Sequence, residues 1–304
     1  ALLWFGVPGA VLQTAILIVI CAVLMEFAFV YHNAMLTSVS SEKTVGTVSG
    51  AAFSLDYLGS VGLFLIWLAL PSMGFLPAEA AFAHERLVGP MAALWFLIFM
   101  IPLFLFTPDR PASDLPLRTA ARAGLQQLSR TLRRVSHYRN IAAYFIVRAI
   151  YADGMSGVFV FLTGFLGFVF GWETAKLGLY ALLVLSVPVF TSALAGVVDD
   201  LIGSKRTIQI ALFFFTLGVL GSLSTTPTEY LFVLPVDDAL RASQLPVIGG
   251  FLALFGFTTF PEQVSLAFSM FGAAFVGPIL ASSRTMVARL SPPEMISELY
   301  GLFN

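Results

Sequence analysis

Charged side chains stand inside long apolar stretches of this chain, and their chemistry is the first clue to what it does. Glu26, Asp56, Arg148, Asp153 and Arg284 each lie within such a stretch. An ionisable group near the centre of a lipid bilayer costs at least about 2.5 kcal/mol on insertion scales, so it needs a partner or a water-lined cavity. Groups of this kind bind solutes or ions, carry protons, or form gates.

Glu26 is the sharpest of these candidates, because it is the lone carboxylate in the apolar run 24–29. Desolvation disfavours the charged form of such a group, so Glu26 is suited to proton coupling or to cation recognition. The alternative is an ion pair between helices that only holds a bundle together. On a helix, Glu26 would share a face with Val30 and Asn33. The residues alone leave both interpretations open.

The other intramembrane charges divide by their depth. Arg148 and Asp153 are five positions apart and point in different directions on a regular helix, unless Gly154 loosens it. Arg148 suits a clamp for a solute carboxylate or, slightly better, a gate ion pair, and Asp153 has the same two interpretations as Glu26. Asp56 and Arg284 lie within about two helical turns of a span end, which favours gating or snorkelling.

Enzyme, metal and nucleotide chemistry find no support in the sequence. Cys21 is the single cysteine, which excludes an intrachain disulfide and any multi-cysteine metal site. The histidines (His32, His84 and His137) lack the spacing of metal ligands, and no P-loop is present. We therefore expect no enzyme, no metal or other cofactor, no nucleic-acid partner and no ATP-driven pump.

Lipid must be the solvent for most of this chain. It is 58% hydrophobic and only 11% charged, against about 25% charged residues in a typical soluble domain. A bilayer core needs roughly 20 apolar residues per helix. This length criterion predicts seven membrane spans, at Pro8–Leu36, Val48–Leu70, Val88–Phe106, Ile141–Gly167, Ala175–Val198, Thr207–Leu223 and Ser265–Ala288. The end segments 1–7 and 299–304 resemble pieces of further spans, so we expect an internal fragment.

The basic residues orient these spans. They concentrate in every second gap, at 37–47, 107–140, 199–206 and 289–298. The positive-inside rule places those gaps in the cytoplasm and the segment 224–264 outside. The apolar run Leu245–Phe260 is only about 16 residues long and contains Pro246, so we expect it to lie on the outer surface or dip in without spanning.

The basic gap 107–140 divides the chain into an N-terminal half, 1–106, and a C-terminal half, 141–304. Its apolar residues recur at helical spacing, which predicts an amphipathic helix on the membrane surface: Leu117, Ala121, Leu125, Leu128, Leu132 and Val135. A linker resting on headgroups is favoured over lipid-dependent regulation. The strings Met35–Ser40, then Gly50, and Met286–Ser291, then Gly301, hint at an internal duplication.

Several strings resemble the major facilitator superfamily and, within it, the autophagy-related vacuolar amino-acid effluxer family with its bacterial relatives. They are Tyr31–Leu36, Ser49-Gly50 with Tyr57–Gly59, Tyr138–Ile141 with Tyr151–Gly154, Asp200–Arg206, and Gly277-Pro278 with Ser282–Arg284 and Ala288–Leu290. The resemblance implies an all-α polytopic membrane protein, a bundle of two pseudo-symmetric six-helix halves. This chain would run from late helix three into early helix eleven and be incomplete at both ends. Asp56, Leu201 and Leu280 depart from the family's usual residues.

The resemblance also implies roles for particular residues. Tyr31 and Asn33 join Glu26, Arg148 and Asp153 as expected substrate or coupling residues. In facilitators, a loop like 199–206 clamps the inner side shut through ion pairs. By this analogy Asp200, Lys205 and Arg206, together with Asp56 and Arg284, are the expected gate residues, although a solvated turn would show the same residues.

Two functions remain in view. The first is a secondary transporter that exports amino acids or related small metabolites by alternating access, with proton coupling, as a monomer in a bacterial inner membrane. Arg148 would bind the carboxylate of a zwitterion, and Glu26 or Asp153 its amine. The alternative is a non-transporting scaffold or sensor whose outer loop, 224–264, offers acidic Asp237-Asp238 and an apolar run to a partner.

The charge pattern makes a direct prediction about topology. Reporter fusions placed at Ser113 and at Asp237 should report opposite sides of the membrane, because the first lies in a basic gap and the second does not. Identical sidedness would show that the number of spans between them is wrong.

Overall fold

The computed structural model describes most of the chain, and the structural statements below concern those residues only. They are Trp4, 9–70, 83–107, 116, 118–119, 122–124, 126–127, 130–131, 138–292 and 295–303, with the backbone alone for 83–86 and Ser297. The six apolar residues of the predicted linker stripe (Leu117, Ala121, Leu125, Leu128, Leu132 and Val135) lie outside the described residues.

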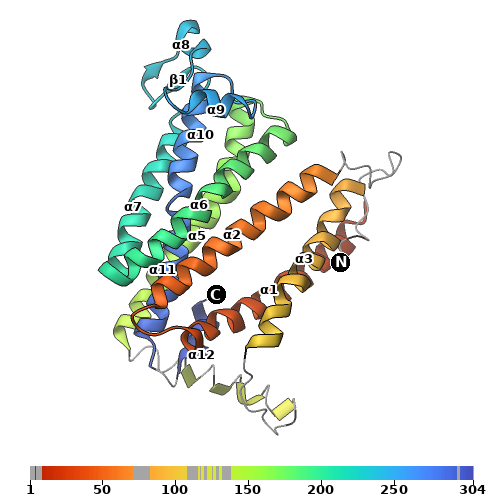
Figure 1. The fold of residues 1–304 in the computed structure, drawn as a ribbon, viewed down its shortest axis with the longest axis vertical. Helices are drawn as coiled ribbons and strands as arrows, with labels where there is room; N and C mark the ends of the chain where they lie inside the picture. The colour runs from red at the N-terminus through yellow and green to blue at the C-terminus, as the bar shows by residue number, and fades with distance from the viewer. Residues whose placement is uncertain are drawn as a thin grey trace. The chain divides into compact units, whose positions relative to one another are not determined.

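The described chain is helical almost throughout, which confirms the all-α polytopic membrane fold. Seven helical segments in it are long and apolar enough to cross a bilayer, and each overlaps one predicted span. They are α1 (Val11–Val39), α2 (Val45–Ala69), α3 (Ala83–Phe106), α5 (Arg139–Phe170), α6 (Thr174–Ile202), α7 (Ser204–Leu223), and α10 (Phe260–Ala273) followed by α11 (Val276–Leu290), which together make the last span (Figure 1).

The helices group into two compact units. The first comprises Ala1–Met35, Gly59–Tyr138 and Pro293–Asn304, and the second comprises Leu36–Leu58 and Arg139–Pro292. Helix α2 therefore begins in the second unit and ends in the first. This grouping differs from a division at the linker, because the first half of α2 packs with the C-terminal helices. The two pseudo-symmetric halves remain a prediction.

The first unit contains most of α1, the end of α2, α3 and the short helix α12 (Ile296–Phe303). Small residues allow α2 to approach α3, since a Cβ atom added at Gly59 would lie 3.6 Å from the Trp95 ring nitrogen. The Thr131 hydroxyl of the linker donates to the Glu298 carboxylate of α12 at 2.7 Å. This hydrogen bond ties the linker to α12.

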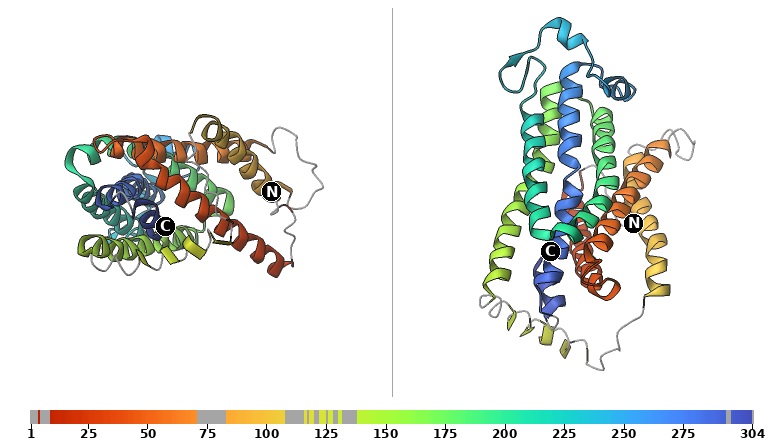
Figure 2. Two further views of the ribbon diagram at one scale, coloured as in Figure 1. Left: turned by 90° about the horizontal axis from the view of Figure 1, so that it is seen from below. Right: turned by 60° about the vertical axis from the view of Figure 1, so that its left-hand side comes forward.

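The second unit is a bundle in which α10 packs along α7 and α11 packs on both α6 and α7 (Figure 2). Glycines make the α7–α10 approach very close: a Cβ atom added at Gly218 would lie 2.5 Å from the Gly272 Cα atom. Buried hydroxyls add hydrogen bonds at the same contact, with Ser222 Oγ 2.8 Å from Ser269 Oγ. Small residues and hydroxyls are the usual means of packing helices in lipid.

The last span is interrupted where α10 gives way to α11. Helix α10 ends at Ala273 and α11 begins at Val276. The Phe275 amide bonds to the Gly272 carbonyl at 3.0 Å, which is a tighter turn than the α-helix. Pro278 has no N–H group, so it cannot donate to the Ala274 carbonyl four residues earlier. One tighter turn therefore interrupts this span between Ala273 and Val276.

A cap made from 224–259 covers the end of this bundle remote from the α6–α7 turn (Figure 1). It holds the antiparallel pair β1 (Glu229–Tyr230) and β2 (Leu234–Pro235) and the short helices α8 (Asp238–Ala242) and α9 (Gly249–Ala253). The buried Gln263 amide donates to the carbonyls of Gly249 (3.1 Å) and Phe257 (2.8 Å), which fastens the cap to α10. The run Leu245–Phe260 contains no helix of membrane length, as the sequence predicts. Its side of the membrane remains a prediction.

The α7–α10 contact makes a prediction about stability. Gly218→Ala should destabilise the protein by about 1–3 kcal/mol, because the new Cβ atom overlaps the α10 backbone. Gly164→Ala on α5 is the matched control, since an added Cβ atom there meets nothing within 4 Å. Thermal unfolding in detergent should therefore show a lower midpoint for the first variant only. Equal midpoints would contradict the close approach.

Candidate functional site

A polar cluster forms where the α6–α7 turn, the start of α2 and the end of α11 meet within the second unit. The turn is tight: Gly203 alone links α6 to α7, with φ +85°, a conformation that side chains disfavour. We call this cluster the latch, and it consists of Asp199, Asp200, Ser204 and Arg289 with the first residues of α2, Gly46 and Thr47.

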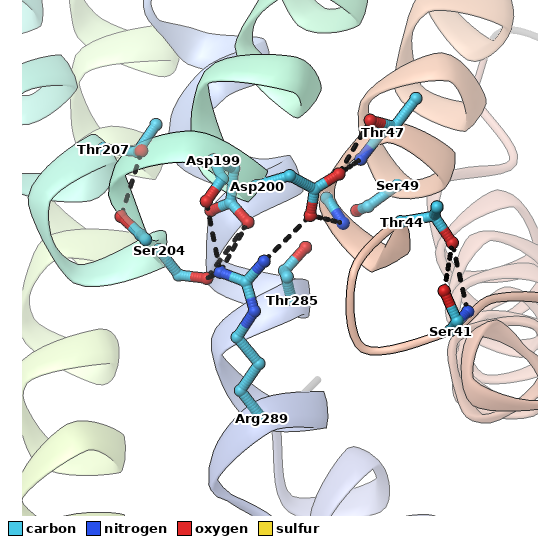
Figure 3. Close-up of polar contacts among 12 residues, drawn as sticks. Ser41, Thr44, Thr47, Ser49, Asp199, Asp200, Ser204, Thr207, Thr285 and Arg289 are labelled. Atoms are coloured by element: carbon cyan, nitrogen blue, oxygen red, sulfur yellow. Dashed lines mark hydrogen bonds and ion pairs between the residues drawn. The ribbon is translucent and has the colours of Figure 1, made fainter.

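Asp200 binds the N-terminus of α2. Its Oδ1 atom accepts from the Gly46 amide at 2.8 Å, and its Oδ2 atom accepts from the Thr47 amide and the Thr47 hydroxyl, both at 2.7 Å (Figure 3). The first amides of a helix have no partner within it and carry partial positive charge, so a carboxylate there is doubly favoured. A residue 154 positions away thus caps α2.

Arg289, at the end of α11, bridges both carboxylates. Its Nη2 atom lies 2.9 Å from Asp200 Oδ1, and its Nη1 atom lies 2.9 Å from Asp199 Oδ2. Nη1 also donates to Ser204 Oγ at 2.7 Å. The planar fork of a guanidinium group suits this divided contact, and Figure 3 shows it aimed at both aspartates. Asp199 is only 1% exposed, so it depends on these partners.

Glycines bring α2 close enough to α6 for these bonds. A Cβ atom added at Gly46 would lie 2.6 Å from Asp200 Oδ1, and one added at Gly196 would lie 3.0 Å from the Gly50 Cα atom. Neither position has room for a side chain. The glycines at the start of α2 and near the end of α6 are therefore part of the latch geometry.

A second polar layer lies one to two turns behind the latch. Arg284 of α11 is buried, and it donates from Nε to Ser49 Oγ and from Nη2 to the Ser49 carbonyl, both at 3.0 Å. Its guanidinium carbon also lies 4.8 Å from the centre of the Phe53 ring. Arg284 thus contacts α2 instead of snorkelling to solvent. Asp56, which is exposed, interacts electrostatically with Arg284.

Two of the expected gate residues belong neither to the latch nor to the layer of Arg284. Lys205 and Arg206 are exposed, and within the described residues the ion pairs of the latch come from Arg289. The cation at Asp200 is therefore supplied by a distant residue, not by the basic residues beside it in sequence. The charge count treats Arg289 only as one of the basic residues of the segment 289–298. Two signals point to it in the sequence: the duplicated string 286–291 and the family-like string Ala288–Leu290.

The structure distributes the expected substrate residues over both units. Glu26 and Tyr31, both exposed, and buried Asn33 belong to the first unit. Arg148 and Asp153 belong to the second, where Asp153 is exposed on α5. Their assembly into one site therefore stays a prediction.

Within the second unit, Arg148 stands beside the contact of α5 with α11. Its guanidinium carbon lies 5.3 Å from the centre of the Tyr151 ring. The hydroxyl of Tyr151 lies 2.6 Å from Ser283 Oγ, and that of Tyr144 donates to the Ser283 carbonyl at 2.7 Å. Since Ser283 precedes Arg284, this contact belongs to the same polar layer.

The seven membrane-length helices of the described chain define an integral, multi-pass membrane protein. A family model described as "Vacuole effluxer Atg22 like" matches residues 31–230, and the chain belongs to this family. The predicted family resemblance is confirmed.

Among curated proteins, the chain is similar to the "Uncharacterized MFS-type transporter YxiO" of Bacillus subtilis (strain 168). The two are 22% identical over 280 residues, which cover 91% of this chain and 57% of that protein. The chain thus spans little more than half the length of its relative. No solved structure matches it significantly.

The latch makes a prediction about stability. Arg289→Met should cost about 2–5 kcal/mol of unfolding free energy, because it leaves the buried Asp199 carboxylate without its cation. Lys205→Met removes an exposed charge at the same turn and should cost less than about 0.5 kcal/mol. Chemical unfolding in detergent measures both. Equal stability of the two variants would show that the Arg289 ion pairs of the latch do not stabilise the fold.

Proposed function

We propose that the protein is a secondary transporter that moves small solutes by alternating access, with the latch as a gate. The observation that carries the proposal is the nature of the latch. It joins α2 to α6, α7 and α11 through ion pairs and hydrogen bonds, which water can replace when they open. The family description and the name of the bacterial relative both support transport.

The exposure of the latch favours reversible opening. The Arg289 side chain is 26% exposed and that of Asp200 is 11% exposed, so both charges can be hydrated without crossing lipid. The Arg289–Asp200 pair lies near water and contributes little net free energy. Opening the Arg289–Asp199 pair requires water to reach the buried Asp199 carboxylate at the same time. Behind them, the buried Arg284–Ser49 contacts form a second polar layer that must also separate.

The proposed sidedness of the gate is cytoplasmic. Three of the four basic segments come together at the latch: 37–47 through Gly46, 199–206 through Asp200, and 289–298 through Arg289. The positive-inside rule assigns such an end to the cytoplasm. On this proposal, the structure represents the state in which the cytoplasmic side of the second unit is latched.

The proposed cargo is an amino acid or a related small metabolite, moved outward from the cytoplasm. A zwitterion needs both a cation and an anion inside the membrane, and Arg148 with Glu26 or Asp153 offers them. Glu26 is the proposed proton-coupling group, because it is a carboxylate in the middle of the long span α1.

Flux in proteoliposomes tests the proposal. The wild-type protein should exchange at least one member of a panel of amino acids. Asp200→Asn should lower turnover by about tenfold or more while leaving the solute affinity within about threefold, since the latch lies away from the solute. Asp238→Asn, which neutralises an exposed aspartate of the cap, is the matched control and should change neither quantity.

The same vesicles test coupling. With a pH gradient imposed, Glu26→Gln should abolish accumulation against a concentration gradient while leaving exchange largely intact. A structural ion pair would instead reduce the folded yield of that variant. No flux for any solute, from protein that is folded, would refute the transport proposal and favour the scaffold or sensor.

A further inference from the structure

A half-open cavity of about 300 Å³ lies within the second unit and is lined by residues of α2, α5, α6, α7, α10 and α11. This volume is at the lower end of the range of small-molecule sites. Most of its wall is apolar, with Leu162 of α5, Val184 of α6, Phe215 of α7 and Val276 of α11 among the lining residues.

The described lining of this cavity includes no Asp, Glu, Lys or Arg. Bringing a charged group into such a wall without a partner is costly. A zwitterion would lose hydration at both charged ends and would meet no opposite charge in this wall. The chemistry of the wall therefore selects an uncharged ligand, a class different from the proposed amino-acid cargo.

One polar group of the wall is held in a fixed orientation. The Tyr180 hydroxyl donates to Ser269 Oγ at 3.0 Å, and Ser269 is itself bonded to the Ser265 carbonyl at 2.9 Å and to Ser222 Oγ at 2.8 Å. All these groups are buried. Because the phenol proton is committed to Ser269, the phenol oxygen offers the cavity an acceptor and no donor.

The break in the last span borders the same cavity. Gly272, Ala273 and Val276, which flank the break, all line it. Irregular backbone at membrane depth is tolerated where it faces protein or a cavity. Small residues at the break leave the space that a ligand would fill.

The cavity is also separate from the latch. Val276 and Arg289 are thirteen positions apart on α11, which is about 20 Å at 1.5 Å per residue. An apolar layer that includes Met155, Ala211 and Ile279 lies next to the cavity on the side of the latch. Residues of the latch can therefore be changed without altering the cavity.

We propose that this cavity binds an uncharged aromatic molecule with a single hydrogen-bond donor, of the size and type of indole, with the donor directed at the Tyr180 oxygen. The apolar wall accounts for the ring, and the committed phenol proton accounts for the donor. The proposal does not depend on transport, because it concerns binding to the full chain.

Equilibrium binding of indole to the protein in nanodiscs tests it, with empty nanodiscs to correct for partition into lipid. 1-Methylindole is the matched ligand, since it keeps the ring but lacks the N–H donor. Tyr180→Phe should weaken indole binding about three- to tenfold and leave 1-methylindole binding unchanged. Ala181→Phe, which places a ring in the cavity, should weaken both ligands at least tenfold. Ala149→Phe, at an exposed position on α5, is its control.

Each outcome of these binding measurements either supports or overturns the proposal. If the Ala181→Phe variant binds both ligands as well as the Ala149→Phe variant does, the ligands sit elsewhere and the proposal is overturned. The proposal is also overturned if Tyr180→Phe changes the affinities for indole and 1-methylindole by the same factor. Because this substitution removes only the hydroxyl group, it decides the question even if the Ala181→Phe variant fails to fold. Absence of amino-acid flux would refute the proposed transport, but it would not change the interpretation of the binding measurements.

Discussion

The second unit depends on one constraint, the burial of the Asp199 carboxylate at the end of a membrane span. A buried anion without a cation would be costly, so Arg289 has to reach it from α11. That requirement fixes where α11 ends against α6. The neighbouring Asp200 pairs with Arg289 and also accepts hydrogen bonds from the first amides of α2. These bonds need α2 close to α6, and positions 46 and 196 are glycines because no side chain fits between the two helices.

The interior of the unit changes character along its length. The latch is polar and near water, the layer of Arg284 is polar and buried, and the layer around Met155 and Ile279 is apolar. Beyond it come the cavity and the break between α10 and α11. When the polar contacts of the latch separate, water can take the place of each partner. The apolar layer has no directional bonds, so its side chains can pack together again without a fixed geometry. A bundle arranged in this order can seal one end firmly and still release it.

Hydropathy and charge predicted most of the fold, because the bilayer imposes its thickness locally on every span. The seven spans followed from length and apolar content, and the non-spanning run 245–260 followed from its short length and from Pro246. The site was only partly predictable. Asp200 and Arg289 each stand in a string that resembles the family, but they are 89 positions apart, and nothing in the sequence indicates that they pair. The cavity gave no signal, since apolar residues that line a space and those that pack have the same sequence pattern.

The two ends of the second unit are held by ion pairs and by hydrogen bonds between side chains and the backbone, but these contacts join different elements at each end. At the cap end, Glu262 accepts from the Trp172 ring nitrogen at 2.7 Å and pairs with Lys176, while Gln263 holds the backbone of the cap. These bonds join α10 to the α5–α6 turn and to the cap, all within the unit. The latch instead holds the start of α2, the helix that both units share. Under the proposed function, opening the latch frees the start of α2 from α6 and α11, whereas the bonds at the cap end do not involve α2.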